Sequence, residues 1–365
     1  MTEYDFVIVG SGLFGAICAH ELKRAGRRVV VLERRRHVGG NVYTEVRDGI
    51  TLHAYGPHIF HTDDDEVWNW INRFATFNDF RLQAVATYQG EVYSLPFSMW
   101  TFSRIYGVTT PEEAKTVIAR QSAHIGEPRN LEEQAIKLVG VDVYEKLIRG
   151  YTEKQWRKPC RELPPSIVRR LPVRFTYDNN YYRHRHQGVA VGGYTQIVEK
   201  LLAGVPVITG CDYLDSRAHW DARGRVIFTG PIDRLFDYAH GELEYKTTEF
   251  VHTFHDVENV QGTAMMNYTD AAVPFTRVVE HKHFEFGVDP GSWITHEYPA
   301  EYRARFSEPY YPVNDAANTA RYRRYRDEAD AKGMLVGGRL GEYKYYDMDQ
   351  VIRSALDFAR ALLTG

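Results

Sequence analysis

The N-terminal segment VIVGSGLFGA is the feature that most constrains the fold of this chain. It places Gly10, Gly12 and Gly15 between an apolar strand, predicted over Phe6–Val9, and a helix predicted over Ala16–Arg24. In this context the first glycine permits a tight turn, the second lets the backbone approach a pyrophosphate, and the third lets helix and strand pack closely. The helix N-terminus attracts the anion. The pattern predicts a Rossmann-like dinucleotide-binding domain.

A second loop for close approach of the backbone narrows the choice of dinucleotide. The strand predicted over Val29–Leu32 leads into Glu33, an acid placed to accept a hydrogen bond from a ribose hydroxyl. Gly39, Gly40 and Asn41 follow, and a nicotinamide cofactor has no evident need of them. The spacing resembles the extended fingerprint of FAD proteins of the glutathione reductase and amine oxidase type. We therefore expect FAD to contact Gly10, Ser11, Gly12, Phe14, Gly15, Glu33, Arg34, Gly39, Gly40 and Asn41.

The C-terminal end of the chain is expected to complete the same domain. Leu335–Gly338 is a short apolar strand, GRLGEYKYYDMD is a loop, and Asp349 is placed to cap a helix through VIRSALDFARALL. The apolar positions of that helix share one face, namely Val351, Ile352, Ala355, Leu356 and Ala359. A helix N-terminus directed at a flavin would stabilise the anionic reduced ring.

Composition excludes several classes of protein. The 365 residues are 44% hydrophobic and 25% charged, which is typical of a soluble globular chain with more than one core. The formal net charge of −3 gives no overall attraction to nucleic acid or anionic membranes. Neither a signal peptide nor a transmembrane run is visible. The cysteines, Cys18, Cys160 and Cys211, have no metal-ligand spacing. We expect a cytoplasmic protein with no metal site, no nucleic-acid partner and no membrane insertion.

The middle of the chain predicts two further domains. Thr110 and Asn130 each precede a helix and have a glutamate three residues on, which marks a helical insert. The stretch 241–300 alternates polar and apolar residues and is expected to form β-sheet. The fold class is therefore α/β (α+β multidomain). The expected parts are a discontinuous Rossmann-like FAD-binding domain (1–75, 189–240 and 332–365), a helical domain (98–168), and a twisted antiparallel sheet domain for the substrate (76–97, 169–188 and 241–331).

Arginine and tyrosine side chains stand together in the middle and C-terminal thirds of the chain. Guanidinium groups suit bidentate phosphate contacts, and tyrosine hydroxyls supply further donors. The groups are Trp156 in GYTEKQWRKP, then Arg169, Arg170, Arg174, Tyr181 and Tyr182, then Arg277, and finally Tyr310, Tyr311, Tyr345 and Asp347. A sugar nucleotide beside a flavin would use them. Such a patch also suits nucleic acid, but it is short and the chain is slightly acidic.

Ten short motifs, in order over nearly the full length, resemble the bacterial UDP-galactopyranose mutases. They are GGN, YGPHIFHT, SLPF, GYTEKQW, LPVRF, MNY, VPFTR, EHK, YYP and GRLGEYKYYDMD. The resemblance implies an isomerase that interconverts UDP-galactopyranose and UDP-galactofuranose. Only reduced FAD is competent in the family, where flavin N5 attacks the anomeric carbon and forms a covalent adduct as UDP departs. The resemblance also implies a homodimer, reduction of FAD by NAD(P)H or another reductant, and a supply of galactofuranose for surface glycans.

The resemblance further assigns roles by position. Trp156 resembles the residue that stacks on uracil, with Tyr151 and Thr152 nearby. Arg170 and Arg277 resemble the catalytic arginines that hold the diphosphate, and His61 lines the sugar and flavin side as a third catalytic residue. The other implied substrate contacts are Tyr181, Asn267, Tyr311, Tyr345 and Asp347. The other implied cofactor contacts are His58, His61, Arg339, Tyr345, Asp347 and Met348.

Departures from the family pattern and other functions stay open at this point. Leu147 stands where relatives have phenylalanine against the uridine, and Lys344 replaces an arginine. His58 and His61 could instead be core or capping residues. A FAD-dependent oxidoreductase of the amine oxidase or desaturase type would share the cradle, but it needs an apolar tunnel and a substrate that reduces the flavin. A flavin-binding redox sensor would leave the polar ligand groups without a use.

Overall fold

The computed structural model describes residues 3–169, 171–221 and 223–364, and the chain divides into two compact units. Unit 1 comprises Met1–Asp79, His184–Thr247 and Glu301–Gly365. Unit 2 comprises Phe80–Arg183 and Thr248–Ala300. Among the residues so described, no helix has both the length and the apolar character needed to cross a membrane.

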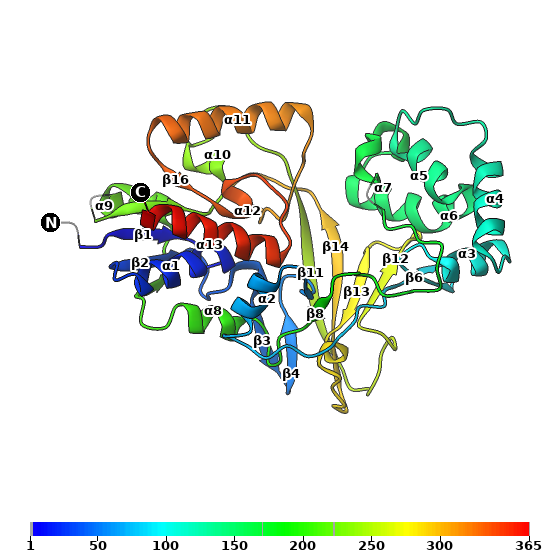
Figure 1. Cartoon of the computed structure of the whole chain (residues 1–365), viewed down its shortest axis with the longest axis horizontal. Coiled ribbons are helices and arrows are strands. Elements are labelled where there is room, and N and C mark those ends of the chain that lie inside the picture. Colours follow the sequence, from blue (N-terminus) through cyan, green and yellow to red (C-terminus); the bar gives the residue numbers. More distant parts are fainter. Residues whose placement is uncertain (1–2, 170, 222, 365) are drawn as a thin grey trace. The chain divides into compact units, whose positions relative to one another are not determined.

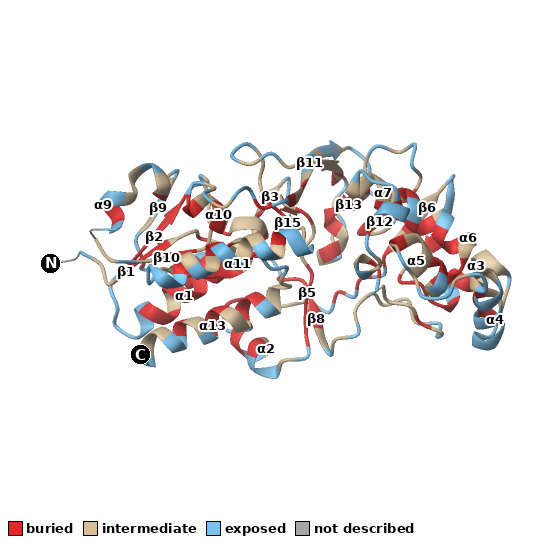
Figure 2. Ribbon diagram, turned by 90° about the horizontal axis from the view of Figure 1, so that it is seen from above, coloured by how far each residue is buried: buried red, intermediate tan, exposed pale blue. Residues whose placement is uncertain are grey.

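The centre of unit 1 is a parallel sheet with the strand order β16, β10, β1, β2, β9 (Figure 1). Its strands are β1 (Phe6–Val9), β2 (Val29–Glu33), β9 (Val207–Thr209), β10 (Arg225–Phe228) and β16 (Leu335–Val336). β1 and β2 are nearly continuous runs of buried apolar residues, drawn red in Figure 2. This pattern is typical of parallel strands that are covered on both faces. The predicted Rossmann-like architecture is confirmed.

The two ends of the chain meet in unit 1. α1 (Leu13–Arg24) follows the glycine turn and packs against α13 (Met348–Thr364), which is the last helix of the chain (Figure 1). The apolar face predicted for α13 is confirmed, because every residue assigned to it is buried. Asp349, expected as the cap, lies instead in the first turn, where its carboxylate accepts a hydrogen bond from the Gln350 N–H at 2.8 Å. The helix begins at Met348, two residues before the Gln350 start that a cap at Asp349 would give.

The remaining elements of unit 1 surround this sheet. The helix α8 (Thr195–Leu201) precedes β9 in the chain. β3 pairs with β4, and β5 pairs with β8, both in antiparallel fashion. The elements are β3 (Thr44–Arg47), β4 (Ile50–His53), β5 (Phe60–Thr62), α2 (Asp65–Ile71), β8 (His186–Gly188), α8 (Thr195–Leu201), α9 (Arg217–Asp221), α10 (Ile232–Leu235), β15 (Tyr311–Pro312), α11 (Ala316–Ala331) and α12 (Gly338–Gly341).

Unit 2 contains a sheet in the order β11, β14, β13, β12, β6, β7. Its strands are β6 (Val85–Tyr88), β7 (Glu91–Ser94), β11 (Tyr245–His255, which begins in unit 1), β12 (Met265–Tyr268), β13 (Arg277–Glu280) and β14 (Ser292–Ala300). The pairs β12–β13, β13–β14 and β6–β7 are antiparallel, but β12 and β6 run parallel. The expected antiparallel sheet is therefore mixed. Gln89 and Gly90 join β6 to β7 with positive φ angles, which are typical of a tight hairpin turn.

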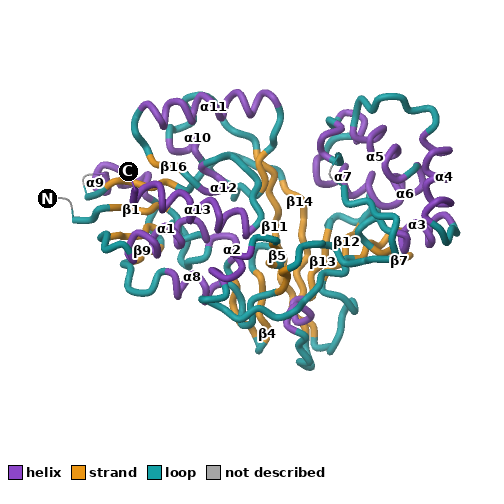
Figure 3. Tube along the Cα trace, in the orientation of Figure 1, coloured by secondary structure: helices purple, strands orange, loops and turns teal. Residues whose placement is uncertain are grey.

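The helical insert also lies in unit 2, as Figure 3 shows for the run of helices that follows β7. Its elements are α3 (Met99–Tyr106), α4 (Pro111–Ser122), α5 (Leu131–Val139), α6 (Val141–Val143), a π-helical turn (Tyr144–Arg149) and α7 (Gly150–Trp156). Thr110 and Glu113 form the predicted capping box, and Asn130 caps α5. Leu147 is buried in the core of this insert. The predicted helical region is confirmed.

Candidate functional site

The two glycine loops predicted to hold a dinucleotide lie against each other in unit 1. The Gly39 N–H donates to the carbonyl oxygen of Ser11 at 3.0 Å, and Gly12 and Gly39 form a parallel β-bridge. A Cβ atom added to Gly40 would lie 2.9 Å from the Cα of Gly12. Only glycine allows this approach, and it does so here at a positive φ of 54°. The second loop is therefore built directly on the first.

The start of α1 has the features of an anion site. A Cβ atom on Gly15 would lie 2.0 Å from the carbonyl oxygen of Gly10, so this glycine serves close packing of helix and turn, as expected. α1 begins at Leu13, and no side chain of a described residue caps its N-terminus. The first N–H groups of a helix have no partner within the helix. They are therefore available to a phosphate group.

Glu33 links the end of β2 to the glycine turn through hydrogen bonds. Its Oε2 accepts hydrogen bonds from the backbone N–H of Ser11 at 2.8 Å and from the Ser11 hydroxyl at 2.7 Å. Its Oε1 accepts from the Arg35 N–H at 2.8 Å. Each carboxylate oxygen can accept more than one hydrogen bond. Contact between Glu33 and a ribose therefore stays a prediction that this arrangement allows.

Arg35 is a candidate cofactor residue that sequence reasoning missed. Its neighbour Arg34, which was predicted, is half exposed and pairs with Glu308 at 2.5 Å. The guanidinium of Arg35 is more buried, donates to Asn41 and to Glu308 at 3.1 Å each, and lies 4.4 Å from the ring centroid of Tyr55. Its Nη1 is buried and makes no hydrogen bond to any residue that the structure describes. Arg35 is one of three consecutive arginines, and nothing in the sequence distinguishes it from the other two.

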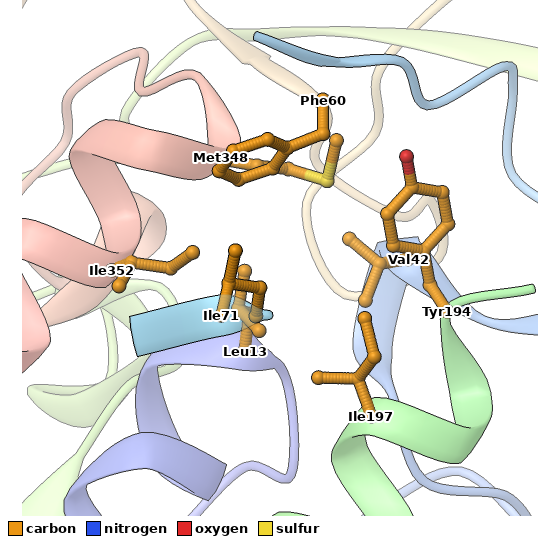
Figure 4. Close-up of a pocket in the computed structure, with 8 residues that line it drawn as sticks. All are labelled: Leu13, Val42, Phe60, Ile71, Tyr194, Ile197, Met348 and Ile352. Atoms are coloured by element: carbon orange, nitrogen blue, oxygen red, sulfur yellow. The ribbon is translucent and has the colours of Figure 1, made fainter. Parts of the chain in front are cut away.

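A small apolar hollow lies where α1 and α13 begin (Figure 4). Leu13 and Met348, the first residues of the two helices, both line it. The lining residues are Leu13, Val42, Phe60, Ile71, Tyr194, Ile197, Met348 and Ile352. Met348 was predicted to contact the cofactor. In the structure, Met348 therefore lines the same hollow as Leu13, the first residue of the helix that follows the glycine turn.

Two predicted histidines, His58 and His61, stand on either side of Phe60 in the sequence, and burial lowers the pKa of both. His58 Nδ1 is 2.9 Å from the Gly56 carbonyl oxygen, and burial lowers the pKa of His58 to about 4. His61, on β5, stacks on His184 with ring centroids 4.6 Å apart. Burial lowers the pKa of His61, and the nearby Asp347 carboxylate opposes that shift. Their contact with a cofactor stays a prediction.

The C-terminal loop of unit 1 gathers an arginine and two tyrosines. Tyr311 and Tyr345 stack with ring centroids 5.9 Å apart, and both remain partly exposed. The Arg339 guanidinium lies 5.1 Å from the Tyr345 ring centroid and donates to the Tyr310 carbonyl oxygen at 2.8 Å. Its Nε is buried and has no hydrogen-bond partner within the described part of the chain. Asp347 stands at the N-cap position of α13, just before Met348, and its carbonyl oxygen accepts from the Val351 N–H at 3.0 Å.

These features of unit 1 fit a bound dinucleotide. The glycine loops leave no room for side chains where a pyrophosphate would approach, and the helix start offers N–H groups that no side chain caps in the described residues. Arg35 and Arg339 each keep a buried N–H that no described residue satisfies. Buried donors of this kind are costly unless a partner is present. A polyanionic ligand with a polar ring system would supply those partners.

In unit 2, Arg277 is the centre of a polar row across three neighbouring strands. In the strand register it stands opposite Asn267 of β12 and Glu297 of β14, so the three side chains share one face of the sheet. Arg277 Nε donates to Asn267 Oδ1 at 3.3 Å, and Nη1 lies 3.4 Å from Glu297 Oε2. Burial raises the pKa of Glu297, and the Arg277 charge opposes this. The row fixes the orientation of the guanidinium.

The predicted uracil-contacting residues lie together on α7. Thr152 is buried, Tyr151 is half-buried, and Trp156 packs against the core of the helical insert. The π-helical turn precedes this helix without a break. Such turns are rare and are often found at functional sites. The structure thus brings Tyr151, Thr152 and Trp156 together on one short helix.

The basic and aromatic stretch after α7 contains both structural and candidate residues. Arg170, a predicted catalytic residue, lies outside the described residues. Arg174 is almost fully buried and donates to the carbonyl oxygens of Asn180 and Tyr181, the latter at 2.8 Å. It therefore holds the backbone that presents Tyr181 and is not a phosphate ligand. The Tyr181 ring makes an edge contact with Tyr182 at 5.1 Å.

The predicted site residues thus fall into two sets, one in each unit. Tyr151, Thr152, Trp156, Tyr181, Asn267 and Arg277 belong to unit 2. The other described ones belong to unit 1. Glu297 was missed because its part depends on standing opposite Arg277, and strand register is not visible in a single sequence.

Two family models match this chain. One described as UDP-galactopyranose mutase covers residues 146–345, which include α7 and the Arg277 row. The other, described as an NAD(P)-binding Rossmann-like domain, covers residues 8–74, which include both glycine loops. Together, the two matched ranges contain most of the candidate site residues.

Full-length relatives agree with these matches. The chain is 37% identical over 372 residues to a dTDP-fucopyranose mutase of Escherichia coli, with 97% of each chain covered. It is also 37% identical over 379 residues to a probable UDP-galactopyranose mutase of Klebsiella pneumoniae, covering 100% of this chain and 96% of the relative. A crystal structure of reduced UDP-galactopyranose mutase matches with a TM-score of 0.73 at 15% identity, covering 100% of this chain and 94% of that one. This last likeness concerns the fold.

Proposed function

Because this chain belongs to the UDP-galactopyranose mutase family of isomerases, we propose that it interconverts UDP-galactopyranose and UDP-galactofuranose. The observation that carries the proposal is the row in which Asn267 and Glu297 hold the Arg277 guanidinium on adjacent strands. A guanidinium fixed in this way suits a phosphate group whose negative charge grows during the reaction. A flavin oxidase acting on an amine or a polyene has no such group to stabilise.

We propose that unit 1 binds FAD. The start of α1, which no side chain of a described residue caps, would meet the pyrophosphate, and Glu33 a ribose hydroxyl. The buried Nε of Arg339 would donate to the cofactor. When bound and reduced, the flavin supplies the nucleophile for the anomeric carbon of the sugar. The full proposed set is Gly10, Ser11, Gly12, Phe14, Gly15, Glu33, Arg34, Gly39, Gly40, Asn41, His58, His61, Arg339, Tyr345, Asp347 and Met348.

We propose that the nucleotide is held mainly by aromatic and basic side chains. The Trp156 ring would stack on the base, with Tyr151 and Thr152 beside it. Arg277 would stabilise the charge on the departing diphosphate. Arg170 is proposed for the same task from the family resemblance alone. The further contacts proposed are Tyr181, Asn267, Tyr311, Tyr345 and Asp347, among which Tyr311 and Tyr345 stack and are both exposed.

We propose a positioning role for His61 on the sugar and flavin side. Burial lowers its pKa, so at neutral pH the imidazole can donate one hydrogen bond and accept another without adding charge.

The direct test is turnover in both redox states. Protein loaded with FAD is reduced with dithionite, incubated with UDP-galactofuranose, and analysed for UDP-galactopyranose by chromatography. We expect conversion by the reduced protein and none by the oxidised protein. Flavin reduction by an amine or a polyene, without isomerisation, would instead establish an oxidoreductase. Flavin binding with neither activity would establish a redox sensor.

A second candidate substrate is dTDP-fucopyranose. The observation that favours it is the E. coli relative, which is as similar to this chain as the K. pneumoniae one. The two nucleotides differ at the base methyl group and the ribose 2′-hydroxyl, and the two sugars differ at C6. The decisive measurement is kcat/KM for the two furanose substrates side by side, since this ratio reports preference directly. A larger value for the thymidine substrate would replace the uridine proposal.

We also propose that the protein works in the cytoplasm as a homodimer, and that NAD(P)H or another cellular reductant reduces its FAD. The resemblance to bacterial mutases supports these points, as does the use of nucleotide sugars inside cells. The product would then supply galactofuranose for cell-surface glycans. Gel filtration with light scattering would test the dimer, and anaerobic titration with NADH and NADPH would test the reductant.

A further inference from the structure

Lys154 lies within α7, between Thr152 and Trp156, and backbone oxygen atoms surround its ammonium group. Nζ donates to the carbonyl oxygens of Tyr268 at 2.7 Å, Phe275 at 2.9 Å and Val273 at 3.0 Å. An ammonium group has three N–H donors and no acceptor. The three carbonyl oxygens therefore match its donors one for one.

All three carbonyl groups belong to one segment that ends at Arg277. Tyr268 is the last residue of β12, and Val273 and Phe275 lie in the loop that leads to Arg277, the first residue of β13. Lys154 thus contacts the start, the middle and the end of this loop. Hydrogen bonds from a charged group are stronger than those between neutral groups. The ammonium group therefore ties three points of the loop to α7.

Other contacts place the same helix on the same segment. A Cβ atom on Gly150 would lie 2.2 Å from the carbonyl oxygen of Thr269, so helix and loop touch through their backbones. The hydroxyl of Thr269 donates to the carbonyl oxygen of Lys146, in the turn before α7, at 2.6 Å. Past the other end of α7, Arg157 donates to the Pro299 carbonyl oxygen of β14 at 3.0 Å. α7 is therefore tied to both strands that neighbour β13.

The surroundings of Lys154 favour a charged donor over a base. Burial lowers the pKa of Lys154 to about 8, and the Asp270 carboxylate opposes this shift. A neutral amine would have only two N–H groups and would turn a lone pair toward a carbonyl oxygen. The three carbonyl oxygens thus stabilise the charged form. A catalytic base needs a lone pair that can reach the substrate, and this geometry provides none.

We propose that Lys154 is a positioning residue that sets the spacing between Trp156 and Arg277 and so fits the site to a nucleoside diphosphate. The inference rests on the proposed function, because it takes Trp156 as the base contact and Arg277 as the diphosphate contact. Trp156 is two residues from Lys154 along α7, and Arg277 is two residues from Phe275 along the loop. The ammonium group is therefore close in the chain to both contacts.

This role predicts different effects on ligands of different length. A ligand that spans both contacts gains from a site whose spacing is fixed beforehand, because it need not order the loop on binding. Uridine touches only the base contact, and inorganic pyrophosphate touches only the diphosphate contact. Loss of the tie should therefore weaken UDP binding and leave the binding of both fragments nearly unchanged. A residue that merely supports the fold would weaken all three.

The test uses the full-length protein loaded with FAD and the variant Lys154→Met, which keeps an unbranched side chain one atom shorter and removes the ammonium group. UDP binding is measured by calorimetry, and binding of uridine and pyrophosphate by NMR titration. We expect UDP affinity to fall roughly tenfold and the fragment affinities to change by less than about twofold. The matched control is Lys158→Met, at an exposed lysine just beyond α7, for which no ligand should bind differently.

Each other result overturns the proposal. An equal loss for UDP and uridine would show a merely structural role, and an unchanged UDP affinity would show no role at all. If Lys154→Met does not fold, Lys154→Arg carries the test, because it keeps the charge but cannot reproduce the donor geometry, and it should show the same loss confined to UDP. Wild-type protein that fails to bind UDP would remove the proposed function itself, whereas wild-type binding with no change in the variants would remove only the role of Lys154.

Discussion

The two units present their candidate ligand groups in opposite ways. In unit 1 the cradle is made of backbone, since its glycines exclude side chains and the start of α1 offers bare N–H groups among the described residues. In unit 2 the groups are side chains on separate strands and a helix, each held by neighbours. A site made of backbone should lose its ligand when a substitution adds a side-chain atom to it. A side-chain site fails when a charge or a hydrogen-bond partner is removed.

The sharpest contrast should come from Arg277→Ala. We expect turnover to fall by on the order of 10²–10³, or about 3–4 kcal/mol in the barrier, because the charge opposite the departing phosphate is lost. Bound FAD, measured by absorbance after gel filtration, should stay at the wild-type level, since the cradle is untouched. The control is Arg225→Ala, at an exposed arginine of β10. Full turnover in Arg277→Ala would remove the assigned role.

The variant Gly15→Ala tests the backbone cradle of unit 1. The added methyl group would lie 2.0 Å from a backbone oxygen, so turn and helix must separate. We expect a loss of about 3 kcal/mol in the free energy of unfolding, together with loss of bound flavin. Urea unfolding and flavin absorbance measure the two effects. Gly126→Ala, where a Cβ atom meets nothing within 4 Å, is the matched control. Normal flavin content in Gly15→Ala would contradict this account of the cradle.

Glu280, the last residue of the strand that begins with Arg277, makes unit 2 sensitive to acid. Its carboxylate accepts from the Val260 and Gln261 N–H groups at 2.9 Å each and from the Ser292 hydroxyl at 2.7 Å. Burial would raise its pKa, but these hydrogen bonds and one from His283 outweigh burial and lower the pKa to about 2. A carboxyl group with a lowered pKa stabilises the fold above its unfolded value, near 4.3.

That stabilisation, about 3 kcal/mol, should be lost as the pH falls from about 4.3 toward 2. Glu280→Gln should therefore unfold more easily than wild type at pH 7, and the difference should shrink in acid. Urea titrations at a series of pH values measure it. Glu258→Gln, at an exposed position, is the control. A difference that stays constant with pH would contradict the assignment.

The smallest effect is expected for Trp156→Ala. Stacking of a base on an aromatic ring is worth roughly 1–3 kcal/mol, so UDP affinity should fall roughly tenfold to a hundredfold. FAD content and the conversion of saturating substrate should change less. Calorimetry with UDP measures the effect, and Trp100→Ala, at an exposed tryptophan of α3, is the control. Wild-type UDP affinity in Trp156→Ala would exclude the stacking contact.

The contrast between the units also explains how far the sequence could be interpreted. Gly10, Gly12 and Gly15 act within one turn, and together with the apolar run before them and Glu33 after them they predict the turn, the strand and the helix. The helix starts at Leu13, three residues before the predicted start at Ala16. The cap at Thr110 and the apolar face of α13 are equally local, and all of these were confirmed. Local structure follows from residues a few positions apart, and a single sequence displays them.

The row through Arg277 could not be predicted in the same way. Asn267 and Glu297 are 10 and 20 residues away, and only the register of two strand pairs makes them neighbours. Arg174 was grouped with phosphate ligands because nothing in the sequence shows that its guanidinium holds the backbone at Tyr181. For Lys154 the partners are carbonyl oxygens, which every residue has. Contacts of this kind depend on tertiary structure and leave no residue pattern.

The loop around Lys154 has a consequence for the conditions under which the protein can work. A loop that gathers carbonyl oxygens around a dissolved metal ion is ordered only when enough of that ion is present. Here the positive charge is part of the chain, so below the Lys154 pKa of about 8 its presence does not depend on a dissolved metal ion. The segment from Thr269 to Thr276 should therefore keep its shape in chelating buffers and in cells of any mineral content.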